Sequence, residues 1–138
     1  MKISELMSPD IKSIGPESPI SEAARLMRDG DFGAVPVADH DRLIGMVTDR
    51  DITVRAVAES RDVSRTKVRD VMTSDLFYCF DDQEVEDIAQ NMGQMQVRRL
   101  PVVDRGKRLV GIVSLGDLAT SGPKQAAAES LEAISQKA

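Results

Sequence analysis

Two short segments of this 138-residue chain place a hydroxyl and a carboxylate at the same spacing. Thr48 stands three residues before Asp51, and Ser114 stands three residues before Asp117. A carboxylate accepts hydrogen bonds at both oxygens, so either aspartate can bind the two adjacent hydroxyls of a ribose. Where a strand passes into a helix, free backbone N–H groups favour an anion such as a phosphate. The pattern therefore suits a nucleotide, with its adenine between apolar strands.

The same residues also have a purely structural interpretation. Ser, Thr and Asp at the start of a helix accept hydrogen bonds from its first backbone N–H groups. Thr48 and Asp51 can therefore form a local helix cap without any ligand. The glycine three residues before each hydroxyl, Gly45 or Gly111, permits another group to approach the strand closely. The sequence leaves both interpretations open.

Each pair belongs to a longer internal repeat. Residues 43–52 return as residues 109–118, and three upstream pairs of segments match: 6–8 with 71–73, 20–27 with 85–92, and 35–37 with 100–102. The offset is 72 − 7 = 65 upstream and 117 − 51 = 66 downstream, which indicates one extra residue in a loop of the second copy. Such a period predicts a fold built by repeating one unit. The predicted parts are repeat 1 at 1–59, a linker at 60–66, repeat 2 at 67–121, and a helical or frayed tail at 122–138.

Apolar periodicity predicts one amphipathic helix early in each repeat. With Ser18 as N-cap and Pro19 at the first helical position, the first helix ends near Gly30. The second helix ends near Gly93. Each helix carries one buried stripe, formed by Ile20, Ala23, Ala24 and Met27 in the first copy and by Val85, Ile88, Ala89 and Met92 in the second.

The remaining elements follow from short apolar runs around polar turns. These runs predict two hairpins, with strands at 34–38, 43–48, 98–103 and 108–114. A further helix follows each hairpin, at 49–59 and after Ser114, and a brief strand precedes each first helix, at 11–14 and 76–80. The order strand, helix, strand, strand, helix predicts an α/β fold of the α+β type. Each unit then has a small three-stranded sheet with two helices on one face.

The composition narrows the classes of function. A net charge of −5 and few aromatic residues (3%) disfavour nucleic acid as a partner, because phosphate binding needs a basic face and base stacking needs aromatic rings. His40 is the only histidine and Cys79 the only cysteine, so we predict no metal site and no catalytic residue. No apolar run is long enough to span a bilayer, and the acidic, mixed start does not resemble a secretory signal. We therefore expect a cytoplasmic protein.

The repeated motifs resemble a tandem pair of cystathionine-β-synthase (CBS) domains, also called a Bateman module. Both copies have Met-Ser/Thr near the start, an apolar-Pro-Val-apolar-Asp run, and Gly-x-x-Ser/Thr-x-x-Asp in the same order. The resemblance covers about residues 1–121, and segments 48–52 and 96–102 are also similar to stand-alone bacterial CBS-pair proteins. It implies two repeats packed sheet to sheet about a pseudo-twofold axis, with two clefts between them. Such modules commonly form homodimers and bind AMP, ADP, ATP or S-adenosylmethionine, usually as sensors.

The resemblance also implies which basic residues contact a ligand. In related modules, basic residues just before the apolar-Pro-Val strand reach the ligand phosphates. Arg98 and Arg99 occupy that place in the second copy and are expected in the cleft of Thr48 and Asp51, where guanidinium groups bind phosphate through paired hydrogen bonds. Arg50 is expected to point toward the other cleft, with Ser114 and Asp117. Surface ion pairs with the abundant Asp and Glu are the alternative role for all three arginines.

Two departures from the family pattern weaken the second cleft. Gly116 stands beside Asp117 where the first copy has a charged residue, and Gly33-Ala34 replace the basic pair in the first copy. The predicted function is regulatory: an adenosine-containing ligand is sensed without a required cofactor, and an unidentified effector protein receives the signal. The alternative is a constitutive homodimeric scaffold that binds no nucleotide.

Overall fold

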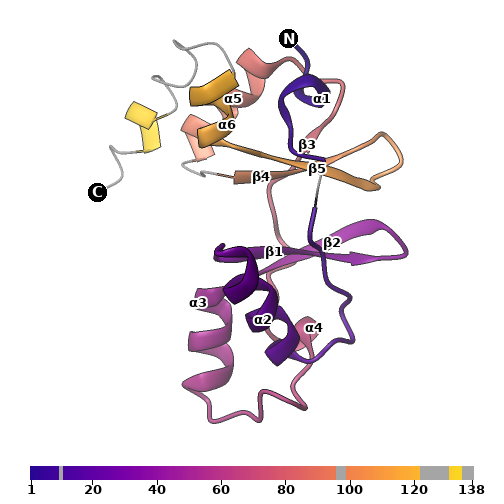
Figure 1. The fold of residues 1–138 in the computed structure, drawn as a ribbon, viewed down its shortest axis with the longest axis vertical. Helices are drawn as coiled ribbons and strands as arrows, with labels where there is room; N and C mark the ends of the chain where they lie inside the picture. Colours follow the sequence, from indigo (N-terminus) through magenta and orange to yellow (C-terminus); the bar gives the residue numbers. More distant parts are fainter. Residues whose placement is uncertain (10, 96–98, 122–130, 135–138) are drawn as a thin grey trace. The chain divides into compact units, whose positions relative to one another are not determined.

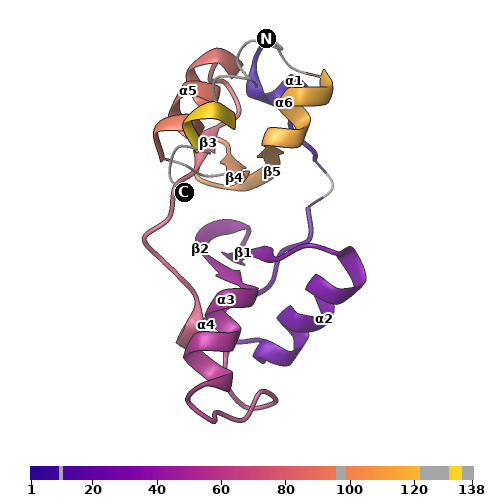
Figure 2. The ribbon, with the colours of Figure 1, turned by 90° about the vertical axis from the view of Figure 1, so that its left-hand side faces the viewer.

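The computed structural model describes residues 1–9, 11–95, 99–121 and 131–134. The chain divides into two compact units, Lys12–Leu76 and Met1–Ile11 with Phe77–Ala138 (Figures 1 and 2). The second unit therefore contains the first residues of the chain, although they precede the body of the first repeat.

The sheet of the unit Lys12–Leu76 is a hairpin. Strand β1 (Ala34–Asp39) pairs antiparallel with β2 (Arg42–Thr48), as predicted. His40 and Asp41 both have positive φ angles, 51° and 67°, which is the conformation of a two-residue type I′ turn. An isolated parallel bridge from Ile14 to Val37 stands where the sequence predicts a third strand, because the segment before the helix pairs at this one position.

Helix α2 (Ile20–Gly30) follows the predicted stripe, but its start differs from the prediction. The N-cap is Pro19, not Ser18. The reason is tertiary: the Ile20 N–H donates to the Thr66 carbonyl at 2.9 Å and the Ser21 N–H to the Val63 carbonyl at 3.1 Å. Backbone carbonyls thus satisfy the first N–H groups of the helix, and no side-chain cap is required there.

The end and the buried face of α2 also differ slightly from the prediction. The left-handed residue at the end is Asp31 (φ 54°, ψ 50°), one position after Gly30. Gly30 has another use, since a Cβ there would overlap the Phe32 ring in its present position. Ala24 is exposed, while Leu26 packs partly buried against the core.

Two further helical segments complete this unit. Helix α3 (Asp49–Ile52) continues directly into a π-helical turn, η1 (Thr53–Val57), within the predicted 49–59 helix. The one-turn helix α4 (Val68–Val71) has no apolar period long enough to be predicted. Figure 1 shows α2, α3 and α4 on the same side of the hairpin. The core of the unit consists of Ile14, Ile20, Ala23, Met27, Val35, Val37, Val47, Ala56, Val68 and Val71.

The unit that contains residues 77–138 has the predicted three-stranded sheet. Strand β3 (Cys79–Phe80) pairs parallel with β4 (Arg99–Val103), which pairs antiparallel with β5 (Leu109–Ser114). Helices α5 (Val85–Met95) and α6 (Leu115–Ser121) lie on one side of this sheet together with α1 (Ile3–Leu6), as Figure 1 shows. The predicted sheet with helices on one face is therefore confirmed for this unit.

The core of this unit includes the predicted stripe of α5. It consists of Ile3, Leu6, Cys79, Val85, Ile88, Ala89, Met92, Leu100, Val102, Val113 and Leu118. Cys79 is buried, and its Sγ donates to the Pro101 carbonyl at 3.8 Å. Burial raises the pKa of the Cys79 thiol to about 12. Of the predicted tail, residues 122–130 and 135–138 lie outside the described residues, and 131–134 are helical with Ile134 buried.

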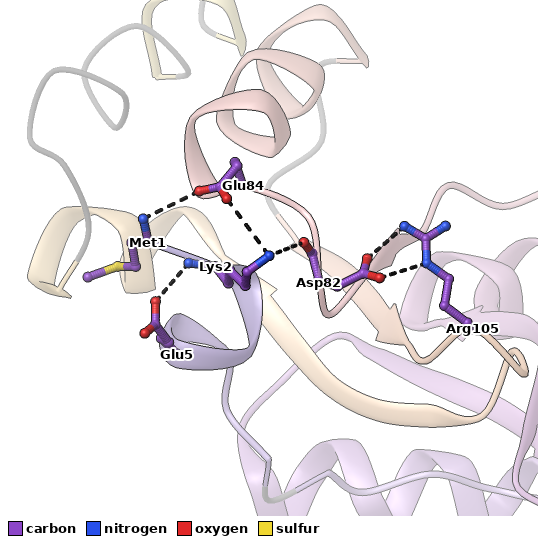
Figure 3. A network of polar contacts seen from close by, with 6 residues as sticks. All are labelled: Met1, Lys2, Glu5, Asp82, Glu84 and Arg105. Carbon is purple, nitrogen blue, oxygen red and sulfur yellow. Dashed lines mark hydrogen bonds and ion pairs between the residues drawn. The ribbon is translucent and has the colours of Figure 1, made fainter.

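Polar contacts fasten the start of the chain to the rest of this unit (Figure 3). Glu84 accepts from the N-terminal amine at 3.4 Å and lies 4.0 Å from the Lys2 Nζ. Lys2 Nζ also donates to the Asp82 carbonyl at 3.2 Å, and Asp82 receives two bonds from Arg105 at 2.8 and 2.7 Å. These groups are exposed, so the buried Ile3 and Leu6 contribute most of the attachment.

Candidate functional site

Thr48 and Asp51 form a reciprocal pair at the junction of β2 and α3. The Asp51 N–H donates to Thr48 Oγ1 at 3.0 Å, and the Thr48 N–H donates to Asp51 Oδ2 at 3.0 Å. Thr48 has extended backbone angles (φ −115°, ψ 163°), as an N-cap residue requires. The structural interpretation is therefore confirmed: this is a capping box. The cap uses only one carboxylate oxygen, Oδ2.

The other oxygen of Asp51 is contacted by two residues that the sequence did not reveal. Thr73 Oγ1 donates to Asp51 Oδ1 at 3.4 Å, and Arg55 Nε lies 3.9 Å from the same oxygen. The Asp51 side chain is 12% exposed. Thr73 belongs to the repeated Met-Ser/Thr motif, for which the sequence predicts no role in the site. Arg55 left only a weaker signal, its position four residues after Asp51.

Arg55 also contacts the end of α4. Its Nη1 donates to the carbonyls of Val71 and Met72, each at 3.2 Å. One guanidinium thus joins α4 to the carboxylate of α3, although α4 is far away in sequence. Since these carbonyls end a helix, they are acceptors that a cation complements well.

The repeated glycines allow the protein's own chain to approach the strand. A Cβ on Gly45 would lie 2.9 Å from the Thr73 carbonyl oxygen and 2.9 Å from Met72 Sδ. Thr73 exchanges two backbone hydrogen bonds with Met46, at 2.8 and 2.9 Å. Gly45 thus permits a close approach to the strand, and Thr73 is the approaching residue. This contact places the Thr73 hydroxyl against Asp51.

The second copy repeats this arrangement in the other unit. The Ser114 N–H donates to Asp117 Oδ2 at 2.9 Å, and the Asp117 N–H donates to Ser114 Oγ at 3.1 Å. Ser8 exchanges backbone hydrogen bonds with Ile112 at 2.8 and 3.0 Å, as Thr73 does with Met46. A Cβ on Gly111 would lie 3.1 Å from the Ser8 carbonyl oxygen. The two copies therefore have the same capping box. In each copy a Met-Ser/Thr segment, called the crossing segment here (72–73 in the first copy and 7–8 in the second), pairs with the strand beside its glycine.

The structure places the predicted arginines in different units. Arg50 is exposed, its backbone N–H donates to Asp49 Oδ1 at 2.8 Å, and its guanidinium has no ion pair among the described residues. Arg99 is exposed at the start of β4, directly across from Ser114 of β5. Arg98 lies outside the described residues. The predicted contact of Arg98 and Arg99 with the ligand of Thr48 and Asp51 stays a prediction.

Metal-ligating side chains do not gather anywhere in the described part of the chain. His40 is 95% exposed in its turn, with Nδ1 3.0 Å from Asp39 Oδ1. Within the described ranges, no helix is long and apolar enough to cross a membrane.

Comparison with known proteins gives the same family for both halves. A family model described as CBS domain matches residues 3–57 and 68–122. The chain is 43% identical over 119 residues to the CBS domain-containing protein YhcV of Bacillus subtilis, covering 86% of this chain and 84% of YhcV. It is 33% identical over 131 residues to Hypoxic response protein 1 of Mycobacterium tuberculosis, covering 94% of this chain and 91% of that protein.

Two solved structures share the fold. The crystal structure of Hypoxic Response Protein I with two coordinated zinc ions has a TM-score of 0.80 at 32% identity, over 89% of this chain and all of that one (100%). The CBS domain pair of protein MJ0100, in complex with 5-methylthioadenosine and S-adenosyl-L-methionine, has a TM-score of 0.72 at 26% identity. That match covers 86% of this chain and 97% of the other.

Proposed function

We propose that this chain, which belongs to the CBS domain family, is a regulatory module that senses an adenosine-containing ligand. The proposed site in the first copy is formed by Thr48 and Asp51, and in the second copy by Ser114 and Asp117. The candidate ligands are AMP, ADP, ATP and S-adenosylmethionine. The MJ0100 domain pair, which is similar in fold, was solved with two adenosine compounds.

The observation that carries this proposal is the geometry of Asp51. The cap occupies Oδ2 with one backbone N–H, and each carboxylate oxygen accepts more than one hydrogen bond. A cap alone needs one acceptor, yet the second oxygen is also held by Thr73 at 3.4 Å and remains on a side chain that is 12% exposed. A carboxylate fixed in this way suits the two neighbouring hydroxyls of a ribose, because its acceptors are oriented before the ligand arrives.

The three predicted arginines, Arg50, Arg98 and Arg99, are the proposed source of positive charge for a ligand phosphate. We propose that Arg98 and Arg99 bind the phosphate of a ligand held by Thr48 and Asp51, and that Arg50 serves a ligand at Ser114 and Asp117. Arg50 and Arg99 are both exposed, so neither must leave a buried partner to bind an anion. Guanidinium groups bind phosphate through two parallel hydrogen bonds, which makes them suitable for this role.

The output of the module is proposed to pass through other chains. A ligand shifts the equilibrium between two arrangements only by its difference in affinity for them, so sensing needs a homodimer or an effector protein whose state changes. We propose that the chain works without catalysis, as a cytoplasmic homodimer that signals to an effector.

A second candidate is a constitutive dimeric scaffold that binds no nucleotide. Two observations favour it. The capping box accounts for Thr48 and Asp51 without a ligand, and the apolar side chains of Val54 and Val57 on η1 are 47% and 58% exposed. A protein partner that covered these two side chains would bury apolar surface, which favours association.

The two candidates are separated by thermal melting with AMP, ADP, ATP, GTP and S-adenosylmethionine. A ligand at about 100 times its Kd stabilises the folded state by ~2.7 kcal/mol, which raises the Tm of a chain of this size by roughly 10 °C. Asp51→Asn should remove that shift and keep the fold, because the asparagine side-chain oxygen can still accept from the Thr48 N–H, whereas its amide nitrogen cannot accept from a ribose hydroxyl. Asp29→Asn, an exposed position on α2, is the matched control. No shift with any compound would favour the scaffold.

A further inference from the structure

Two stretches of the unit Lys12–Leu76 meet at one oxygen atom: α3 with η1, and Thr73 just after α4. Asp51 Oδ1, which the helix cap does not use, is contacted by Thr73 at 3.4 Å and by Arg55 Nε at 3.9 Å. Arg55 is itself held by the Val71 and Met72 carbonyls at 3.2 Å. The guanidinium is thus fixed at one end by the end of α4, and its other side faces the carboxylate.

This arrangement restricts the orientation of the Asp51 carboxylate, which the side chain's own last torsion angle leaves largely free. Rotation of the Asp side chain about its last bond has broad minima, so one hydrogen bond at Oδ2 does not determine where Oδ1 points. Thr73 supplies one constraint at Oδ1, and Arg55 supplies a second that is charged and anchored to backbone. Together they define the plane of the carboxylate, which decides whether both oxygens can face a ribose at once.

The second copy differs at this position. With the offset of 66 that relates the second halves of the repeats, Arg55 corresponds to Ser121, the last residue of α6. The capping box is the same in both copies, so Arg55 is not needed for capping. An arginine present in only one copy indicates a role in which the two sites differ.

We propose that Arg55 is a positioning residue that orients the Asp51 carboxylate for the ribose of the ligand. This inference rests on the proposed function, since it assumes a ribose at Asp51. Arg55 acts through Asp51 and not on the phosphate. Its loss therefore weakens every ligand that contains the same ribose by the same factor, whether or not that ligand carries a phosphate.

The test compares AMP with adenosine by titration calorimetry on the full chain. Arg55→Gln should weaken both by about tenfold, because a support for a charged hydrogen-bond acceptor is lost. Arg28→Gln is the matched control: Arg28 is a more exposed arginine in the same unit (71% against 51% for Arg55), paired with Asp29 at 2.9 Å. Arg55→Lys keeps the charge without the planar fork and should fall between the wild type and Arg55→Gln. It also provides a folded variant if Arg55→Gln melts early.

A second readout needs no ligand. The Thr48 N–H is bonded to Asp51 Oδ2, so a carboxylate that turns more freely should speed hydrogen exchange at Thr48. The Ser114 N–H, in the equivalent cap of the other copy, should not change and serves as an internal control.

Equal losses for AMP and adenosine, with faster exchange at Thr48, would support the proposal. A loss for AMP alone would overturn it, because Arg55 would then contact the phosphate. Unchanged affinities and unchanged exchange would overturn it as well. If the wild type binds neither compound, the proposed function fails, and exchange at Thr48 alone decides whether Arg55 positions the carboxylate.

Discussion

Gly45→Ala should destabilise the unit Lys12–Leu76 by a measurable and predictable amount. The new Cβ would lie 2.9 Å from the Thr73 carbonyl oxygen, which is backbone and cannot rotate away, and 2.9 Å from Met72 Sδ, which can. Relief requires the crossing segment to move, which weakens the two hydrogen bonds between Met46 and Thr73.

The magnitude follows from three contributions. Overpacking costs about 1–3 kcal/mol. Each weakened backbone hydrogen bond costs up to about 1 kcal/mol, but part of this cost is already included in the overpacking cost. Alanine lowers the entropy of the unfolded chain, which offsets about 0.4–1 kcal/mol. The expected net loss is about 1–2 kcal/mol, or a fall in Tm of roughly 4–7 °C.

Urea unfolding and thermal melting measure this loss, and the chain supplies two controls. Gly15→Ala should be nearly neutral, because a Cβ there would contact only Ser18 Oγ, at 3.8 Å. Gly111→Ala should resemble Gly45→Ala, because its Cβ would lie 2.5 Å from Met7 Sδ and 3.1 Å from the Ser8 carbonyl oxygen. If Gly45→Ala were as stable as Gly15→Ala, the crossing segment would not approach the strand as described, and the placement of Thr73 beside Asp51 would be wrong.

Three further perturbations test other parts of the structure. Val35→Asp or Leu100→Asp places a charge at a position that is 0% or 1% exposed, and each should abolish the cooperative melt; a cooperative transition near the wild-type Tm would refute the strand placement. Cys79 should react with iodoacetamide only after unfolding, because its thiol is buried. Burial also raises its pKa to about 12, so its contribution to the stability of the fold is complete below the unfolded-state pKa of about 8.5 and declines as the pH rises toward 12. Arg105→Ala should return the pKa of Asp82, now lowered by hydrogen bonds from Arg105, toward its ordinary value in an NMR titration and barely change the Tm, since the pair is exposed; an unchanged Asp82 titration would contradict the pairing.

The sequence predicted the elements whose signals are local. Both hairpins and the stripe of α5 were predicted because alternation and helical period are properties of neighbouring residues. Helices α1 and α4 were not predicted, because four residues carry no readable period and their formation depends on burying Ile3 and Leu6, or Val68 and Val71. The cap of α2 was placed wrongly for a related reason, since distant backbone carbonyls replace the local side chain.

The candidate site shows the same division. Thr48 and Asp51 were found because a capping box and a ribose-binding pair both use a spacing of three residues. Thr73 and Arg55 were given no role in the site, because their contacts join residues that are far apart in sequence: Thr73 is 22 residues from Asp51, and Arg55 is 16 from Val71. From the sequence alone, Thr73 can be recognised only as part of the repeated Met-Ser/Thr motif. Its partner depends on how the crossing segment folds back.

The placement of the first residues in the unit of the second repeat has an evolutionary consequence. Residues Met1–Ile11 complete the unit built from residues 77–138, while α4 of the second repeat completes the unit Lys12–Leu76. A protein with one repeat that kept this arrangement would be complete only as a pair of chains that exchanged their N-terminal segments. Duplication and fusion of such a gene turns an association that depends on protein concentration into one that does not. A single repeat expressed alone should therefore dimerise, and light scattering of that fragment would detect it.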